Sequence, residues 1–382
     1  MLHNPKHAIL ILAFSILSVC TTGAKAPEKV STPASDSRVT FIGRTLVNGD
    51  NVSFDWSGVY ARIRFTGNYL AMKASDTRRN YYNVWIDSDQ SEEPDRIIST
   101  HGADSLIVLF DENDIVRKWG KAKSAPTVHN VVIQKRTEGE QGTTTVSAFI
   151  SEGQLLQAEG VRERLIEVIG DSYTCGYGTE NSVKTDPFKV ETENCNKSYS
   201  SIVPRYFGAD YIHVAHSGMG IARNYNDNVK GWYMPERYLQ TFDMDRESRW
   251  DAAKTGYHPD ITIIYLGAND FSVQRQPTLA VFMEGYITLL KEIKANWGED
   301  HPILCVAGPS DFNIAAFINE VVRNCGLKNV SMTAMSSTIL NDDSDLGASY
   351  HPNYSGHKKV SMCIIPVVAT KTGWDLTGAP IE

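Results

Sequence analysis

Two patterns of hydrophobic and polar positions divide the chain. Between about residues 38 and 160, apolar residues alternate with polar ones or run in brief segments such as "NVSFDW", "VYARIRF" and "HNVVIQKR". Turn sequences such as Asn48-Gly49-Asp50 separate these segments, and no helical period persists. Short strands at roughly 8–12-residue spacing predict an all-β sandwich over residues 38–160.

The pattern changes after Gly160, where continuous apolar runs predict buried strands. The runs cover residues 164–170, 210–218, 260–267 and 302–308. Between them, "LAVFMEGYITLLKEIKANW" and "FNIAAFINEVVRN" repeat apolar residues at steps of three and four, which predicts helices. Strands that alternate with helices predict an α/β domain over residues 161–382, with a parallel sheet between helices. Ligands of such sheets bind beyond the carboxyl ends of the strands, so functional residues are expected there.

The first 26 residues predict an export signal. Their apolar stretch, Ala8–Val19, is shorter than the ~20 residues that cross a bilayer, so no transmembrane segment is expected. Two processing sites compete: a lipoprotein-like box that would place a lipid anchor on Cys20, and an ordinary cleavage site after "AKA" at 24–26. Residues 27–37 are rich in Pro, Ser and Thr and predict a disordered tether.

Charge and cysteine content narrow the class of protein. The net charge of −8, without a basic stripe, argues against a nucleic-acid partner and suits a neutral or cationic ligand. Loss or lipidation of Cys20 leaves an odd number of cysteines, which cannot form a complete disulfide framework. Cys175 and Cys195 bracket one loop, and the sequence leaves open whether they form a disulfide or stay as free thiols.

Polar signatures follow three of the four predicted strands. They are "GDS" at 170–172, "SGMG" at 217–220 and "GAND" at 267–270. Near the C-terminus, His351 precedes Pro352, which suits the first position of a last helix. Acyl transfer needs a nucleophile, a base and donors for the oxyanion. Ser172 and His351 supply the first two.

The oxyanion donors would come from the other two signatures. Glycine at position 218 lets a backbone N–H approach a ligand closely, and the side-chain amide of Asn269 is a second donor. The four blocks, in this order, resemble the SGNH (GDSL-type) hydrolases. The resemblance implies Ser172 as nucleophile and His351 as base. It also implies Gly218 and Asn269 as oxyanion donors, with no metal and no organic cofactor.

The front segment "GRTLVNGDNVSFDWSGVYARIRFTG" narrows the match. It resembles the front domain of the second carbohydrate-esterase family, and the similarity runs from about residue 40 to residue 372. The resemblance implies a jelly-roll sandwich followed by a flavodoxin-like, three-layer SGNH domain. It also implies an acetyl esterase whose partner is an acetylated polysaccharide or oligosaccharide, of the xylan or glucomannan type.

One departure from the family pattern concerns the residue that orients the histidine. SGNH hydrolases usually carry an aspartate three residues before it, and here that position is Ala348, followed by Ser349. The family resemblance implies a Ser-His dyad oriented by a backbone carbonyl. Loss of the carboxylate can cost ~10⁴ in kcat in a triad enzyme. A glycan-binding protein with little turnover is therefore a rival, and an esterase for lipid or bacterial-wall acetyl groups is another.

Two further groups of residues concern metal and sugar binding. His213 and His216 are three apart on a strand, so they point to opposite faces and do not make a metal site. The insertion at 223–250 carries Tyr225, Trp232 and Tyr233, which could stack on a sugar ring. Packing of the insertion onto the sheet is the competing explanation for these aromatic residues.

Overall fold

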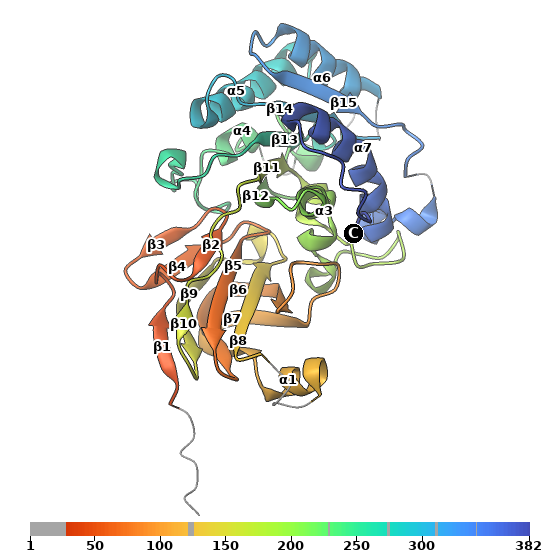
Figure 1. Ribbon diagram of the computed structural model, residues 1–382. Coiled ribbons are helices and arrows are strands. Elements are labelled where there is room, and N and C mark those ends of the chain that lie inside the picture. Colours follow the sequence, from red (N-terminus) through yellow and green to blue (C-terminus); the bar gives the residue numbers. More distant parts are fainter. Residues whose placement is uncertain (1–27, 121–125, 228–229, 273–275, 310–311, 341) are drawn as a thin grey trace, which may run out of the picture.

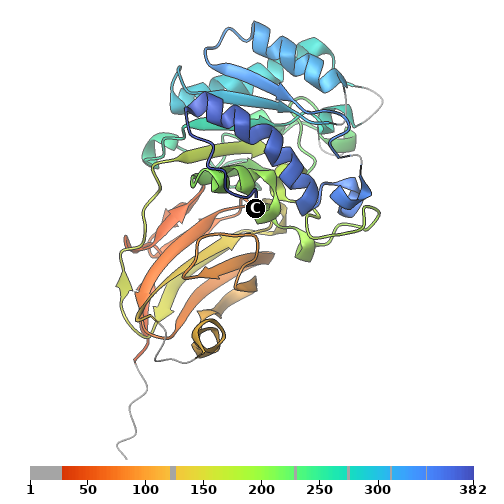
Figure 2. The ribbon, with the colours of Figure 1, turned by 45° about the vertical axis from the view of Figure 1, so that its right-hand side comes forward.

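A computed structural model of the chain describes residues 28–120, 126–227, 230–272, 276–309, 312–340 and 342–382. The export signal and Cys20, predicted from the first 26 residues, lie outside this range. An α/β domain stacks on one end of a β-sandwich, in the order that the sequence predicts (Figure 1, Figure 2). Among the described residues, no helix is both long and apolar enough to cross a bilayer.

The front domain is an antiparallel β-sandwich. Its strands are β1 (Val30–Pro33), β2 (Thr40–Ile42), β3 (Leu46–Asn48), β4 (Asn51–Phe54), β5 (Tyr60–Thr66), β6 (Leu70–Ile86), β7 (Arg96–Phe110), β8 (Val128–Lys135), β9 (Thr144–Ser151) and β10 (Leu155–Leu156). The long strand β6 pairs with β9 through residues 70–76 and with β8 through residues 82–86. One strand therefore belongs to both halves of the sandwich, and the predicted all-β fold is confirmed.

Several elements of this domain differ from the sequence prediction. Part of the predicted tether is the strand β1, which pairs with β9. The pattern predicts two strands where β6 is continuous, because the middle of β6 is polar; Asp76 and Asn80 in this stretch are nevertheless buried. Asp76 there accepts hydrogen bonds from Asn80 Nδ2 at 2.9 Å and Thr100 Oγ1 at 2.7 Å. The helix α1 (Glu112–Trp119) was not predicted, although Asp111 begins it with a capping box.

The second domain is built on a parallel sheet of five strands. In spatial order they are β12 (Asp210–Ala215), β11 (Leu165–Gly170), β13 (Ile261–Tyr265), β14 (Ile303–Ala307) and β15 (Val330–Ala334). In chain order this is 2-1-3-4-5, the flavodoxin-like arrangement. The first four strands confirm the predicted runs. The fifth was missed because its sequence, "VSMTA", is half-buried at the sheet edge and carries no continuous apolar run.

Helices cover both faces of this sheet. On one face lie α3 (Tyr199–Tyr206) and α7 (Tyr354–Thr372), and on the other α5 (Leu279–Trp297) and α6 (Phe312–Asn324). Successive residues of β13 point to opposite faces, so Ile263 packs with α3 and α7 and Ile264 with α5. Two short helices, α2 (Ser172–Cys175) and α4 (Met234–Arg237), follow the first two strands. The three-layer α/β fold is confirmed.

Buried polar pairs join the two domains. The guanidinium of Arg62, in β5, is paired with the carboxylate of Asp210, in β12, and both side chains are almost fully buried. Trp56 Nε1 donates to the carbonyl of Thr241 across the same boundary at 2.9 Å. Because a buried charge is costly without its partner, these pairs fix the front domain on the second one. Residues of the front domain can therefore take part in a site at the sheet edge.

Candidate active site

The predicted nucleophile lies at the carboxyl end of β11, as the sequence pattern requires. Asp171 begins α2 by accepting a hydrogen bond from the N–H of Tyr173 at 3.1 Å, which makes Ser172 the first helical residue. A Cβ at Gly170 would lie 1.9 Å from Thr174 Oγ1, so only glycine allows this tight passage from strand to helix. Ser172 thereby lies at the edge of the sheet on a short, fixed turn.

The structure brings His351 to this serine across 179 positions of the chain. Its Nε2 lies 2.8 Å from Ser172 Oγ. The distance is that of a hydrogen bond in which imidazole can take the hydroxyl proton as a general base. The loop before α7 therefore supplies the partner that the strand end lacks.

A backbone carbonyl contacts the other nitrogen of the imidazole. His351 Nδ1 lies 3.2 Å from the carbonyl oxygen of Ser349. Because a carbonyl only accepts, the proton belongs on Nδ1, and this leaves the lone pair of Nε2 for Ser172. Ser349 and Tyr350 have φ of 52° and 62°, in the left-handed region, so the chain turns back on itself here. Their N–H groups donate to the carbonyls of Asp186 and Lys184, at 2.9 Å each, which holds this turn.

Position 348 has no room for the family's usual carboxylate. Ala348 is fully buried and packs directly against Gly178. A Cβ atom added to Gly178 would lie only 2.6 Å from the Cβ of Ala348. The nearest buried carboxylate upstream, Asp345, is paired with Lys359 and accepts a hydrogen bond from Ser355 at 3.0 Å. The Ser349 carbonyl is thus the acceptor that the fold offers to His351.

Aromatic rings surround the imidazole. The ring of Tyr177 lies 4.3 Å from that of His351 and stacks on Phe188 at 4.2 Å, while Tyr173 contacts His351 edge-on at 5.5 Å. Burial lowers the pKa of His351, and the hydrogen bond to Ser349 acts in the opposite direction. A lowered pKa favours the neutral imidazole, which is the form that a base needs. These rings were not predicted as site residues, and the only sequence signal was their place in the loop after "GDS".

Two backbone N–H groups are free to bind an oxyanion. Within the described residues, no group accepts a hydrogen bond from the N–H of Ser172 or of Gly218. Gly218 has φ of 79°, and its carbonyl accepts from the N–H of Tyr225 at 2.7 Å. Glycine is the residue that adopts this conformation without strain.

The third predicted donor is bonded inside the protein. Asn269 Nδ2 donates to Asp171 Oδ2 at 3.0 Å and to the carbonyl of Met219 at 2.8 Å. Both of its hydrogens are therefore accepted, and its role as an oxyanion donor stays a prediction. Asp270, next in the chain, accepts from the N–H of Ile221 at 3.0 Å and so braces the loop that carries Gly218.

The structure separates the three aromatic residues predicted to bind sugar. The guanidinium groups of Arg237 and Arg246 lie over the ring of Trp232 at 3.7 and 4.3 Å, so this ring packs within the protein. Tyr233 is half-buried at the start of α4. Tyr225 alone among the three is exposed, by 55%, and it lies against Gly218. Of the three, only Tyr225 is therefore both exposed and next to Gly218.

The two cysteines of the nearby loop are separate thiols rather than a disulfide. Cys175 Sγ lies 3.5 Å from Glu138 Oε2, and Cys195 Sγ lies 3.5 Å from the carbonyl of Lys135. Both partners belong to the front domain. These thiols therefore contact the domain boundary and not each other.

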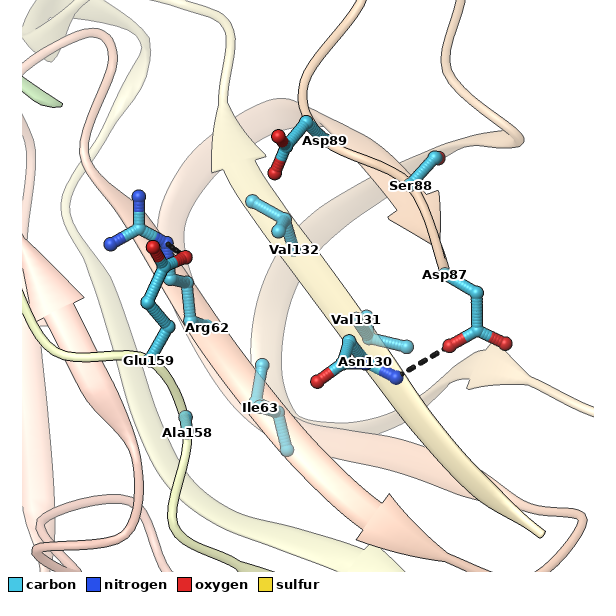
Figure 3. A pocket seen from close by; sticks show the side chains of 10 residues that line it. All are labelled: Arg62, Ile63, Asp87, Ser88, Asp89, Asn130, Val131, Val132, Ala158 and Glu159. Atoms are coloured by element: carbon cyan, nitrogen blue, oxygen red, sulfur yellow. Dashed lines mark hydrogen bonds and ion pairs between the residues drawn. The ribbon is translucent and has the colours of Figure 1, made fainter. Parts of the chain in front are cut away.

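A separate hollow of about 370 Å³ opens on the front domain (Figure 3). None of its ten lining residues belongs to the predicted site. Its charged groups are paired within the protein, among them Arg62 with Glu159 at 3.4 Å and Asp87 with the N–H of Asn130 at 2.7 Å. We therefore assign the chemistry to the edge of the parallel sheet and not to this hollow.

The fold and the site together define a hydrolase with a serine and a histidine at the edge of a flavodoxin-like sheet. Residues 168–359 match the GDSL-like Lipase/Acylhydrolase family, and residues 41–158 match the Carbohydrate esterase 2 N-terminal domain. The first match covers half of the chain, which therefore belongs to the GDSL-like lipase/acylhydrolase family. The protein is a carboxylic ester hydrolase with a front domain of the carbohydrate-esterase type.

Relatives of known activity match both domains of the chain. The chain is 28% identical over 326 residues to "Cellulase/esterase CelE" of Acetivibrio thermocellus, covering 84% of this chain and 38% of that protein's length. It is 24% identical over 352 residues to an "Acetylxylan esterase / glucomannan deacetylase" of Cellvibrio japonicus, covering 87% and 90%. A solved family two carbohydrate esterase from Clostridium thermocellum, in complex with cellohexaose, has 27% identity and a TM-score of 0.77, covering 88% and 100%.

Proposed function

We propose that the protein is an exported serine esterase that removes O-acetyl groups from polysaccharide sugars by Ser-His catalysis. The observation that carries the proposal is the 2.8 Å contact between His351 Nε2 and Ser172 Oγ. The Nδ1 contact with the Ser349 carbonyl adds to it, because that contact selects the tautomer in which Nε2 is the base.

The reaction follows from the arrangement of these groups. Ser172 Oγ attacks the acetyl carbonyl carbon while its proton passes to His351 Nε2. The negative charge that develops on the carbonyl oxygen is stabilised by the free N–H groups of Ser172 and Gly218. Collapse of this intermediate breaks the ester bond, and the sugar oxygen takes the proton from His351. Water, deprotonated by His351, then attacks the acetyl-serine, and Ser172 Oγ takes this proton back from His351 as acetate leaves.

Two features favour a glycan as the substrate. Tyr225 and Tyr350, both more than half exposed, lie beside Gly218 and His351, where aromatic faces suit sugar rings. One relative is an acetylxylan esterase / glucomannan deacetylase, and one solved relative is in complex with cellohexaose. Acetylated xylan or glucomannan is accordingly the substrate class that we propose, with export predicted by the first 26 residues.

Acetate release from a panel of polysaccharides tests the proposal. Acetylated xylan, acetylated glucomannan and acetylated peptidoglycan are incubated with the wild-type protein and with Ser172→Ala. We expect acetate from one or both plant polysaccharides and none with Ser172→Ala, because no other hydroxyl reaches His351 Nε2 within the described residues. Full activity of Ser172→Ala would refute the mechanism, and release from peptidoglycan alone would refute the substrate class.

A glycan-binding protein with little turnover is the second candidate. The observation that favours it is the internal bonding of both amide hydrogens of Asn269, which leaves two oxyanion donors rather than three. The same panel separates the two functions. Binding to a polysaccharide, measured by calorimetry, without any acetate release would favour the binding protein.

A further inference from the structure

A carboxylate of the front domain reaches the loop of the oxyanion site. Glu138 follows β8, and its side chain is almost fully buried at the domain boundary. Its Oε2 accepts a hydrogen bond from the N–H of Ser217 at 2.7 Å. Ser217 directly precedes Gly218, whose own N–H is free. Across the domain boundary, a charged acceptor therefore contacts the residue beside the candidate oxyanion donor.

The loop needs an external partner at this point. Gly218 has positive φ, and glycine has more backbone freedom than any other residue. A carboxylate that accepts a backbone N–H makes a charge-assisted hydrogen bond, which is shorter and roughly twice as strong as a neutral one. The bond to Ser217 therefore restricts the peptide that precedes Gly218, whereas Asp270 holds the chain after Gly218, at Ile221.

Neighbouring groups hold Glu138 in place. Its backbone N–H donates to Glu193 Oε2 at 3.2 Å, and its carbonyl accepts from Lys135 Nζ at 2.9 Å. Burial and the charge of Glu138 raise the pKa of Glu193. The negative charge of Glu138 also acts to raise the pKa of His351, against the effect of burial. Residues 348 and 349 are alanine and serine, so neither carries a charge that could raise the pKa of His351.

We propose that Glu138 is a positioning residue of the esterase: it holds the Ser217–Gly218 turn in the geometry that receives the oxyanion, so catalysis requires the docked front domain. This inference rests on the proposed Ser-His mechanism. Glu138 touches no reacting atom and acts through the turn.

The test compares Glu138→Gln and Glu138→Ala in hydrolysis of p-nitrophenyl acetate by the full chain. An amide oxygen at 138 still accepts the Ser217 N–H, but without charge, so we expect kcat to fall about tenfold in Glu138→Gln. Glu138→Ala removes the acceptor, and kcat should fall ~10²-fold, towards the loss of one oxyanion donor. KM should change less than about twofold in both, because the turn acts on the transition state.

Asp55→Asn is the matched control. Asp55 is a buried front-domain carboxylate that also accepts N–H groups of the second domain, from Asp243 at 2.8 Å and Met244 at 3.1 Å, but it does not contact Ser217. We expect its kcat to equal that of the wild type. Rates are expressed per Ser172 titrated with a fluorophosphonate, so that partial unfolding of a variant does not lower the kcat obtained.

The outcomes separate the two proposals. Activity of Ser172→Ala would remove the Ser-His mechanism, whatever the Glu138 variants do. If Ser172→Ala is inactive but both Glu138 variants keep wild-type kcat, Glu138 has no positioning role. An equal loss in Asp55→Asn would assign the effect to domain docking in general and would also overturn the inference. A rise in KM at constant kcat in the Glu138 variants would also overturn the inference.

Discussion

Ala348→Asp tests why the orienting carboxylate is missing. The substitution places a carboxyl group where SGNH hydrolases usually carry one, and a family argument alone would expect faster turnover. The structure leads to the opposite expectation. Ala348 is fully buried against Gly178, and Nδ1 of His351 already has the Ser349 carbonyl as acceptor.

The magnitude follows from the burial. An isolated buried carboxyl group avoids its charge by binding a proton, which at pH 7 costs about 4 kcal/mol for a group with an unfolded pKa near 3.9. Overpacking of a site with no spare volume adds ~1–3 kcal/mol. We expect a loss of about 5–7 kcal/mol at pH 7, or roughly 10–28 °C in the thermal midpoint. Because the pKa of the carboxyl group is raised in the folded state, the cost of protonation becomes smaller as the pH is lowered. It is about 1.5 kcal/mol at pH 5.

Thermal unfolding followed by circular dichroism at pH 5 and pH 7, together with kcat, measures both effects. Ser349→Asp is the matched control, because it places the same group at the neighbouring exposed position and should change stability by less than about 0.5 kcal/mol. The reasoning is refuted if Ala348→Asp raises kcat tenfold or more with an unchanged thermal midpoint. A destabilisation that does not shrink at pH 5 would refute the buried-carboxyl part.

Two further expectations concern the reaction itself. Asn269→Ala should lower kcat ~10²–10³-fold if its amide turns from Met219 to the oxyanion, whereas a loss below about threefold would make Asn269 purely structural. Burial lowers the pKa of His351, and the base must be neutral, so activity should persist below pH 6.5 and disappear only as pH falls through that lowered pKa. A profile of kcat/KM against pH with an acid limb above 6.5 would contradict this.

The sequence by itself determined the architecture and singled out Ser172 and His351, which the structure brings into contact. Period-two segments and buried runs specify a sandwich followed by a parallel sheet, because side-chain periodicity follows directly from strand and helix geometry. The carboxyl ends of parallel strands meet at one edge, so "GDS" and "SGMG" are placed together by topology. His351, after the last strand and before α7, belongs to the same edge.

Elements whose stability comes from tertiary partners escaped prediction. The middle of β6 is polar, yet Asp76 is buried there because side chains from β7 and β9 bond to its carboxylate. The strand β15 is recognisable only by its pairing with β14, since its residues are half-buried. A one-dimensional pattern records hydrophobicity, and these segments are held by hydrogen bonds instead.

Only the tertiary structure decided which group contacts His351 Nδ1 and which group holds the Ser217–Gly218 turn. A carbonyl carries no sequence signature, and Ser349 presents one only because its left-handed backbone is held by residues 184 and 186. Glu138 reaches Ser217 from a different domain, 79 positions away. Such contacts depend on how two domains dock and how one loop turns, and local sequence specifies neither, because their energies come from groups that are neighbours only in space.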